Sequence, residues 1–283
     1  MKTNQHYIFA ITLVATLGGL LFGYDTAVIS GTVESLRVFF IEPYHLPLDQ
    51  ANALEGFVVS SALIGCILGA SFAGWLSQRY GRKPTLILAA VLFLLSAVGS
   101  AWPELGTGWP GSGNHTTMYL FVAYRILGGI GVGLASMVSP MYIAEIAPAD
   151  KRGNLVSWNQ FAIIFGMLVV YFVNYSIALQ GDAGWLHTVG WRWMFASESI
   201  PALLFLVFLA LVPETPRYLV MRGRTEKATR ILTRLMGEEE ANREVKAIGE
   251  SFREKEASMR PYYRFMGAWI VLFLLLYGAL AWG

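Results

Sequence analysis

Residues 8–31 read IFAITLVATLGGLLFGYDTAVISG, an apolar run that contains one charged side chain, Asp25. A run of about 20 apolar residues is long enough to cross a bilayer as one helix. A carboxylate at membrane depth costs about 3 kcal/mol or more, and chains retain one where it faces a partner, a cavity or a proton path. The run therefore predicts a membrane protein that moves something, with protons involved. In the alternative interpretation, Asp25 lies high in the bilayer and touches interfacial water.

Composition extends this conclusion to the whole chain. Of the 283 residues, 55% are hydrophobic and only 14% are charged, against roughly 25% charge in soluble domains. Seven stretches have the length and apolarity of spanning helices: residues 8–31, 56–77, 84–101, 118–137, 156–177, 193–212 and 265–282. The predicted fold class is an all-α polytopic membrane protein. The single cysteine, Cys66, offers neither a disulfide within the chain nor a metal-ligand spacing.

Lysine and arginine are divided unevenly between the two ends of these helices. Eighteen of the 21 fall on one side, at Lys2, in residues 79–83 and 151–152, and in residues 217–264. Arg37 and Arg192 fall on the other side, and Arg125 lies inside a helix. By the positive-inside rule, the N-terminus and the segment after the sixth helix are cytoplasmic. Membrane topology thus explains the basic residues, and nothing in them indicates a nucleic-acid partner.

The order of the segments predicts three regions. Residues 1–212 form a six-helix transmembrane bundle, residues 213–260 a charged cytoplasmic segment, and residues 261–283 a seventh transmembrane segment. Apolar residues recur at helical spacing around Leu232 and Leu235, which predicts short amphipathic helices in the charged segment. Six helices followed by such a segment are typical of half a transporter, built of two three-helix units in inverted arrangement. Glycine spacing in the fourth helix predicts close helix packing.

Three charged side chains lie at a similar predicted depth in three different helices. Asp25, Arg125 and Glu198 are each about seven residues, or ~10 Å, from the outer end of their helix. An arginine beside a carboxylate that can bind a proton forms a switch, because protonation of Asp25 would release Arg125. Two alternatives stay open. The first is a static ion pair between the first and fourth helices, and the second is a Glu198 that caps or pairs near the end of the sixth.

Four motifs resemble those of the sugar porter family of the major facilitator superfamily. They are GWLSQRYGRK at residues 74–83, PMYIAEIAP at 140–148 followed by Arg152-Gly153, GWRWMF at 190–195 and PETPR at 213–217. The resemblance covers about residues 7–255, and the first and fourth helices look most like those of the family's bacterial xylose:proton symporters. It implies the N-terminal half of a major facilitator fold, a central sugar site reached by alternating access, and a bacterial inner-membrane location. It also implies that Asp25 and Arg125 form the proton-coupling pair, with Glu198 as a second participant.

The same resemblance implies a cytoplasmic gate made of charges at helix ends: Arg82, Glu145, Arg152, Glu214 and Arg217. Opposite charges on one membrane face can hold that side shut and separate as it opens. In the alternative interpretation, these charges are topology signals and solvated side chains, since an exposed pair contributes only ~0–1 kcal/mol.

Two residues are predicted to contact a sugar. Gln160 in the fifth helix offers amide donors and an acceptor for hydroxyl groups, and Phe22 in the first offers an aromatic face for the C–H side. The resemblance implies the same two positions. The alternatives are an interhelical hydrogen bond for Gln160 and ordinary helix packing for Phe22.

The resemblance is predicted to end near Met259. The apolar stretch 265–282 has no Gln, Asn or charged residue, whereas the family's seventh helix normally carries polar sugar-binding residues. The chain is therefore interpreted as an N-terminal half or a truncated form. It is expected either to pair with a second copy or a separate C-terminal half, or to have poor stability, because a lone bundle would expose Asp25 and Gln160 to lipid.

The predicted function is proton-coupled symport of a monosaccharide, xylose or a similar pentose or hexose, across a lipid bilayer. The alternatives are a proton-independent facilitator and a non-transporting sensor or assembly subunit on the same scaffold. The sequence contains no nucleophile–base pair, phosphate-binding loop or metal-ligand cluster. We therefore expect neither an enzyme nor a bound cofactor or metal.

Overall fold

The computed structural model describes residues 5–105 and 115–254, which are mostly helical. Six helical segments among these residues are long and apolar enough to cross a membrane. They are α1 (Gln5–Val28) with η1 (Ile29–Gly31), α3 (Leu48–Tyr80), α4 (Arg82–Ala101), α5 (His115–Ile146), α6 (Arg152–Ala178), and the series α7 (Ala183–Trp185), η4 (Leu186–Gly190), α8 (Trp191–Ser197) and α9 (Ser199–Leu211). The six predicted spanning helices are confirmed in length and composition. The predicted seventh lies outside the described residues.

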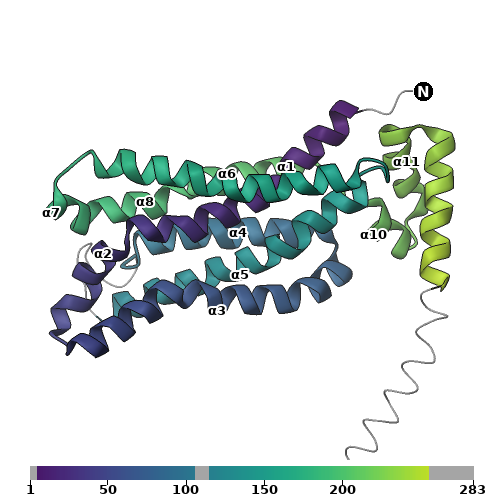
Figure 1. Cartoon of the computed structure of the whole chain (residues 1–283). Helices are drawn as coiled ribbons and strands as arrows, with labels where there is room; N and C mark the ends of the chain where they lie inside the picture. The colour runs from purple at the N-terminus through teal and green to yellow at the C-terminus, as the bar shows by residue number, and fades with distance from the viewer. Residues whose placement is uncertain (1–4, 106–114, 255–283) are drawn as a thin grey trace, which may run out of the picture. The chain divides into compact units, whose positions relative to one another are not determined.

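The six segments form one bundle within the unit Asn4–Thr215 (Figure 1). Helix α5 packs along α3 and α4, and it also touches α1 and α6. Helix α1 packs mainly on α6, while α4 also packs on α8 and α9. Between α1 and α3 the chain forms the short helices α2 (Val33–Leu36), η2 (Arg37–Ile41) and η3 (Glu42–Tyr44). Three helices, α1, α4 and α5, are thus in contact along the interior, where the charged residues lie.

The observed helices extend beyond the apolar stretches seen in the sequence. Helix α3 begins at Leu48 rather than at residue 56, and α5 ends at Ile146 rather than at residue 137. The helical backbone continues into polar turns that a hydropathy pattern leaves out. Only Gly81 separates α3 from α4, and its φ of 112° is a conformation that favours glycine.

The sixth spanning segment is interrupted at Glu198, between α8 and α9. Pro201 explains the interruption, because it has no N–H to donate to the carbonyl of Ser197 and its ring crowds that carbonyl. The N–H of Glu198 donates to the carbonyl of Phe195 at 3.2 Å, three residues back instead of four. An acidic residue therefore lies at the interruption of the helix.

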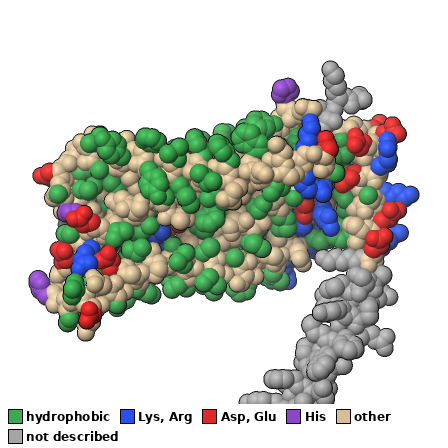
Figure 2. Space-filling model, in the orientation of Figure 1, with side chains coloured by type: hydrophobic (Ala, Val, Ile, Leu, Met, Phe, Trp, Pro, Cys, Tyr) green, Lys and Arg blue, Asp and Glu red, His purple; other side chains and the backbone are tan. Residues whose placement is uncertain are grey.

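The lateral surface of the bundle is apolar. Figure 2 shows hydrophobic side chains over most of its visible side. Large side chains on α3, α6 and α9 are more than half exposed: Leu63, Ile67, Ile164, Phe172 and Leu211. Such a surface is unfavourable in water and is covered by hydrocarbon or by another protein. The surface thus supports the membrane-protein class predicted from composition.

Helices α3 and α5 approach closely because glycines line their contact. A Cβ atom on Gly65 would overlap the carbonyl oxygen of Ile126, and one on Gly129 would overlap that of Ala62. Gly133, one turn along α5, is equally close to the backbone of α3. The close packing predicted from the glycine spacing is therefore confirmed.

A second unit begins at Pro216 and is described by itself. It contains α10 (Pro216–Met221), α11 (Thr225–Met236) and a helix over residues 238–254. Leu232 and Leu235 of α11 are buried, whereas its charged residues are exposed. The predicted amphipathic helices are confirmed.

Replacing Gly129 by Ala is expected to destabilise the bundle by about 1–3 kcal/mol, because the added methyl group overpacks the α3–α5 contact. Thermal unfolding in detergent, followed by tryptophan fluorescence, measures this loss. The matched control is Gly74→Ala, at a glycine of α3 whose added Cβ meets nothing within 4 Å. The control should be neutral or stabilising by up to about 1 kcal/mol, because Ala favours helix. Equal effects of the two substitutions would contradict the conclusion that α3 and α5 pack closely at Gly129.

Candidate functional site

Asp25 of α1 and Arg125 of α5 form an ion pair inside the bundle. The Nη1 of Arg125 donates to Oδ1 of Asp25 at 2.5 Å, and each residue is only 2% exposed. The guanidinium of Arg125 also lies 5.4 Å from the centroid of the Phe195 ring. This cation–π contact stabilises the positive charge of Arg125, which burial removes from water. The structure thus brings together two side chains for which the sequence indicated only a common depth and a plausible pairing.

Glu198 completes the group of charges at this level. It is fully buried, and neither of its carboxylate oxygens has a hydrogen-bond partner among the described residues. It lies near enough to Asp25 and Arg125 to interact electrostatically with both. The site therefore contains one cation and two acids, and the cation is hydrogen-bonded to only one acid. A cation between two acids can stabilise either of them in its ionised form.

A hydrogen bond joins the neighbours of the two acids. The hydroxyl oxygens of Tyr24 and Ser197 are 2.7 Å apart. Ser197 also donates to the carbonyl of Met194 at 2.5 Å, so the Tyr24 hydroxyl is the donor to Ser197. This bond ties α1 to α8 beside the interruption at Glu198.

A second buried ion pair, between Arg192 and Glu104, was not predicted. Arg192 donates to both oxygens of Glu104, at 2.8 and 2.5 Å, and to the carbonyl of Ala101 at 2.9 Å. Its guanidinium stacks 4.5 Å from the ring centroid of Trp191. The sequence placed Arg192 on the outer side without a partner, whereas the structure buries it in α8. The partner was missed because Glu104 follows α4 and is distant along the chain.

Three of the five predicted gate residues meet at the ends of α3, α4 and α5. The Nη2 of Arg82 donates to one oxygen of Glu145 at 2.7 Å, and the other oxygen accepts from the Thr215 hydroxyl at 2.6 Å. Tyr142 donates from its hydroxyl to the carbonyl of Pro213 at 2.6 Å. We call the group formed by Arg82, Glu145 and Glu214, with the hydroxyl groups of Tyr142 and Thr215, the charge cluster. The cluster connects the start of α4 and the end of α5 with the segment after α9.

Glu214 caps the N-terminus of α4. Its carboxylate accepts the backbone N–H groups of Arg82, Lys83 and Thr215 at 2.8 to 3.3 Å. The first N–H groups of a helix have no partner within it, and an anion there is stabilised by the helix dipole. Burial raises the pKa of Glu214, and these N–H groups and the Arg82 charge offset only part of that increase.

The other two predicted gate residues are not part of the charge cluster as described. Arg152, at the start of α6, is exposed and has no ion pair with any described residue. Arg217 belongs to the second unit, where its guanidinium lies 5.3 Å from the ring centroid of Phe252. The sequence indicated charges at helix ends, but it carried no distance information that could decide which of them meet.

The predicted sugar contacts lie at neighbouring levels of adjacent helices. A Cβ atom on Gly23 of α1 would overlap the carbonyl oxygen of Ile163 on α6. Phe22 precedes Gly23 by one residue, and Gln160 precedes Ile163 by three. Phe22 is half-buried, whereas Gln160 is exposed and has no hydrogen bond to a described residue. The interhelical hydrogen bond considered for Gln160 is therefore not formed within the described part of the chain.

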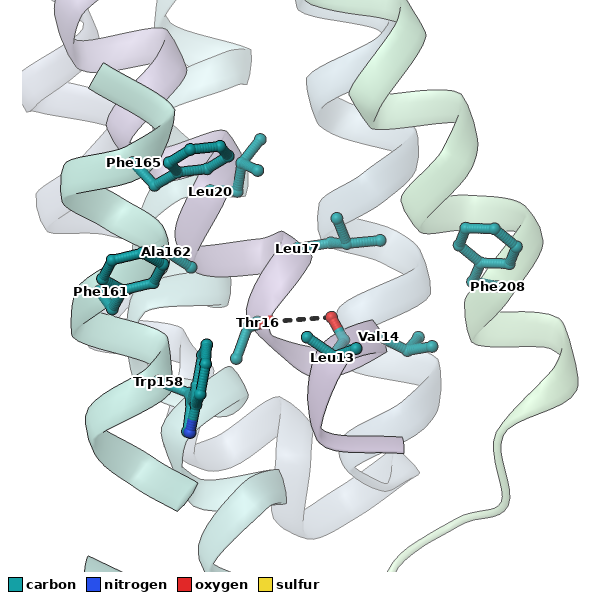
Figure 3. A pocket seen from close by; sticks show the side chains of 10 residues that line it. All are labelled: Leu13, Val14, Thr16, Leu17, Leu20, Trp158, Phe161, Ala162, Phe165 and Phe208. Atoms are coloured by element: carbon teal, nitrogen blue, oxygen red, sulfur yellow. Dashed lines mark hydrogen bonds between the residues drawn. The ribbon is translucent and has the colours of Figure 1, made fainter. Parts of the chain in front are cut away.

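An apolar groove of about 430 Å³ runs between α1, α6 and α9 (Figure 3). It is lined by Leu13, Val14, Thr16, Leu17, Leu20, Trp158, Phe161, Ala162, Phe165 and Phe208. The hydroxyl of Thr16 donates to the carbonyl of Leu13 at 2.8 Å, so it is already engaged. The side chains that line it are apolar except for the Trp158 indole N–H and the Thr16 hydroxyl, and neither Phe22 nor Gln160 lines the groove. The groove is thus distinct from the predicted sugar site.

Known sequences resemble the chain over most of its length. The sequence model of the family described as sugar (and other) transporter matches residues 11–282. The D-xylose-proton symporter of Escherichia coli (strain K12) is 62% identical over 254 residues, covering 88% of this chain and 52% of that protein. The glucose facilitated diffusion protein of Zymomonas mobilis is 38% identical, with coverages of 89% and 52%. The chain therefore spans about half the length of the curated relatives it matches.

Solved structures give the same result. The proton:xylose symporter XylE bound to 6-bromo-6-deoxy-D-glucose has a TM-score of 0.85 and 61% identity, covering 89% of this chain and 54% of that one. A partially occluded inward open conformation of XylE from E. coli has a TM-score of 0.86 and 59% identity, with coverages of 89% and 61%. The predicted major facilitator fold and family resemblance are confirmed.

The predicted end of the resemblance near Met259 agrees in length with the match to the E. coli symporter, which covers 254 residues, whereas the family-model match extends further. The family match reaches residue 282, well past Met259. The prediction relied on individual polar motifs, which the apolar stretch 265–282 lacks. A family model also weighs the overall residue pattern, and that pattern continues.

The pH dependence of folding stability is expected to change when Glu214 is replaced by Gln. Because the pKa of Glu214 is raised in the folded protein, its contribution to stability is fully present below the unfolded pKa and is lost as pH rises through the folded pKa. The melting temperature of the unsubstituted chain, relative to Glu214→Gln, should therefore fall as pH rises. Thermal unfolding in detergent across acid to neutral pH measures the difference.

The control for this comparison is Glu42→Gln, since Glu42 is an exposed acid in η3. It removes one carboxylate without touching the α4 cap. A Glu214→Gln difference that stays constant with pH, or that matches the control, would exclude the proposed role of burial.

Proposed function

This chain belongs to the sugar transporter family, and we propose that it forms the N-terminal half of a proton-coupled monosaccharide symporter. The observation that carries the proposal is the buried ion pair of Asp25 and Arg125, with unpartnered Glu198 beside it. Ionisable acids are costly at this depth and mark proton or ion pathways when they are retained. The high identity to a D-xylose-proton symporter supports the same reading.

Protons act on this site through Asp25. In the described arrangement Asp25 accepts a hydrogen bond from Arg125, and this ion pair is proposed as the state with ionised Asp25. An ionised carboxylate without a partner would be costly in the bundle interior, so Glu198 carries a proton in this arrangement. Protonation of Asp25 removes the attraction that holds Arg125, which keeps its own charge. Arg125 then turns to Glu198 as that acid releases its proton, and the exchange gives two arrangements whose populations depend on protons.

The sugar binds beside α1 and α6 in this proposal. The exposed amide of Gln160 is free to bond with hydroxyl groups, and the half-buried ring of Phe22 at a neighbouring level packs against the C–H side. D-xylose is the proposed substrate, because the 62%-identical relative is named for it. Similar pentoses or hexoses present the same groups.

The charge cluster is proposed to act as the cytoplasmic gate. Arg82, Glu145 and Glu214 join helix ends that belong to different parts of the bundle. Their bonds hold that end together in one state of the alternating-access cycle and break in the other. Arg152 and Arg217 are proposed to join the cluster in other states, since both lie next to its elements in sequence.

The complete transporter is proposed to require a partner half in a bacterial inner membrane. The chain spans about half of its relatives' length, so the remaining sugar contacts come from a C-terminal half or a second copy. The N-terminus and the second unit are proposed to lie in the cytoplasm, on the side with most of the lysine and arginine.

Proton-independent facilitation is the second candidate. A glucose facilitated diffusion protein is 38% identical to the chain. In a facilitator, the Asp25–Arg125 pair would be structural only, and uptake would not depend on pH. A symporter accumulates sugar against the sugar's own concentration gradient when a proton gradient is present, whereas a facilitator does not.

Asp25→Asn is expected to abolish proton-driven accumulation of D-xylose, because the amide cannot bind and release a proton. For this test the chain is co-expressed with the part of the E. coli D-xylose-proton symporter that it does not match, and the pair is reconstituted in proteoliposomes. With an inward proton gradient, labelled xylose should reach only the external concentration. Exchange of internal for external xylose should continue, because the sugar contacts are intact.

The matched control is Asp49→Asn, since Asp49 is an exposed acid at the start of α3. It should accumulate xylose like the unsubstituted pair. Normal accumulation by Asp25→Asn would exclude symport through Asp25 and favour facilitation.

Gln160→Ala is expected to weaken the apparent xylose affinity of the same reconstituted pair about tenfold, which corresponds to one lost hydrogen bond. The measurement is the KM for exchange, which does not depend on a proton gradient. Gln180→Ala, an exposed glutamine beyond the end of α6, is the control. An unchanged KM in Gln160→Ala would remove Gln160 from the substrate site.

A further inference from the structure

Ser96 of α4 is a buried serine near the ion pair, and no interaction described so far uses its hydroxyl group. Its hydroxyl oxygen is inaccessible and has no hydrogen-bond partner among the described residues. Some buried hydroxyls in the bundle donate to a backbone carbonyl three or four residues back, as Ser61 does to Val58 at 2.8 Å and Thr85 to Gly81 at 2.7 Å. Among the described residues, the hydroxyls of Ser100 and Ser139 resemble that of Ser96 in having no partner. Buried polar groups without a partner are rare and call for an explanation.

Gly128 locates this hydroxyl relative to Asp25. A Cβ atom on Gly128, one turn after Arg125 in α5, would overlap Ser96 Oγ and lie 3.8 Å from Asp25 Oδ1. The serine oxygen therefore occupies the space that a side chain at residue 128 would fill, next to the carboxylate oxygen that Arg125 binds. This placement of the Cβ atom limits the separation of the serine and carboxylate oxygens to at most about 6 Å.

We infer that the Ser96 hydroxyl is a further polar group of the proton site, which donates a hydrogen bond to ionised Asp25 when Arg125 moves away. The inference rests on the proposed proton coupling through Asp25. The hydroxyl is a neutral donor, so it stabilises the ionised acid without holding it as firmly as Arg125 does. Ser96 thereby lets Asp25 release its proton during the part of the cycle in which Arg125 is turned to Glu198.

Charged and titratable groups from several helices interact with Asp25 in the described part of the chain. Arg125 of α5 and Glu198 between α8 and α9 act on it directly. Cys66 of α3 is within electrostatic reach as well. Ser96 is the polar contribution from α4.

The test follows the protonation of Asp25 itself. The full chain is reconstituted in lipid nanodiscs and titrated with pH, and the carbonyl stretch of protonated carboxyl groups is recorded by infrared difference spectroscopy. Asp25→Asn identifies the band of Asp25. In an Arg125→Gln background, where the arginine no longer holds Asp25 and to which all further variants are added, Ser96→Ala should move the midpoint of that band upward by about one pH unit, because the ionised form loses a donor. Ser96→Thr, which keeps the hydroxyl, should restore the original midpoint.

Two further variants separate this role from packing. Gly128→Ala should also raise the midpoint, since its methyl group displaces the Ser96 hydroxyl, and it serves if Ser96→Ala does not fold. Ser139→Ala should leave the midpoint unchanged. Ser139 carries a similarly buried, unpartnered hydroxyl, but it lies ~21 Å along α5 from Arg125.

The outcomes distinguish the inference from the proposed function. A titrating Asp25 band with the same midpoint in Ser96→Ala and Gly128→Ala overturns the role of Ser96 and leaves proton coupling intact. The absence of any band that disappears in Asp25→Asn overturns the coupling role of Asp25, and the inference with it.

Discussion

A charge buried in a bundle that faces hydrocarbon must be paired, and the ion pair of Asp25 and Arg125 meets that constraint. The pair joins α1 to α5, and both helices pack on further helices of the bundle. Removing one partner would leave the other charge uncompensated, at a cost of about 3–5 kcal/mol. A second acid, Glu198, is buried close enough to interact electrostatically with both members of the pair.

Helix α5 connects the ion pair with the charge cluster. Arg125 lies about a third of the way along this helix and Glu145 near its end, roughly 20 residues and ~30 Å apart. Pro140 lies inside α5 between these two residues and has no N–H to donate to the carbonyl of Ser136, which favours a bend at that point. In the same stretch, Gly129 and Gly133 bring the backbone of α5 into close contact with that of α3. The ion pair and the charge cluster therefore share one helix, with a charged residue at each site and a proline between them.

Some parts of the site could be predicted and others could not. The costly charge of Asp25 was visible in one apolar run, and helical rise placed Arg125 at a matching depth. The Arg192–Glu104 pair was missed because its members are distant in sequence and one lies in a connecting segment. Ser96 gave no signal, since an isolated serine in an apolar helix is ordinary. Only its position beside Gly128, close to Asp25, indicates a role for its hydroxyl group.

The sequence by itself determined the class of protein, the number of spanning helices in the described residues, and the identities of the charges that need partners. Hydropathy and helical rise are local properties, so they can be read along the chain. Only the tertiary structure decided which charges meet: Asp25 with Arg125, and Arg82 with Glu145, while Arg152 stays apart. Partner choice depends on the rotation and approach of whole helices. Backbone contacts at glycines determine how closely the helices approach. These contacts join residues that are distant in sequence, so no single stretch of sequence predicts them.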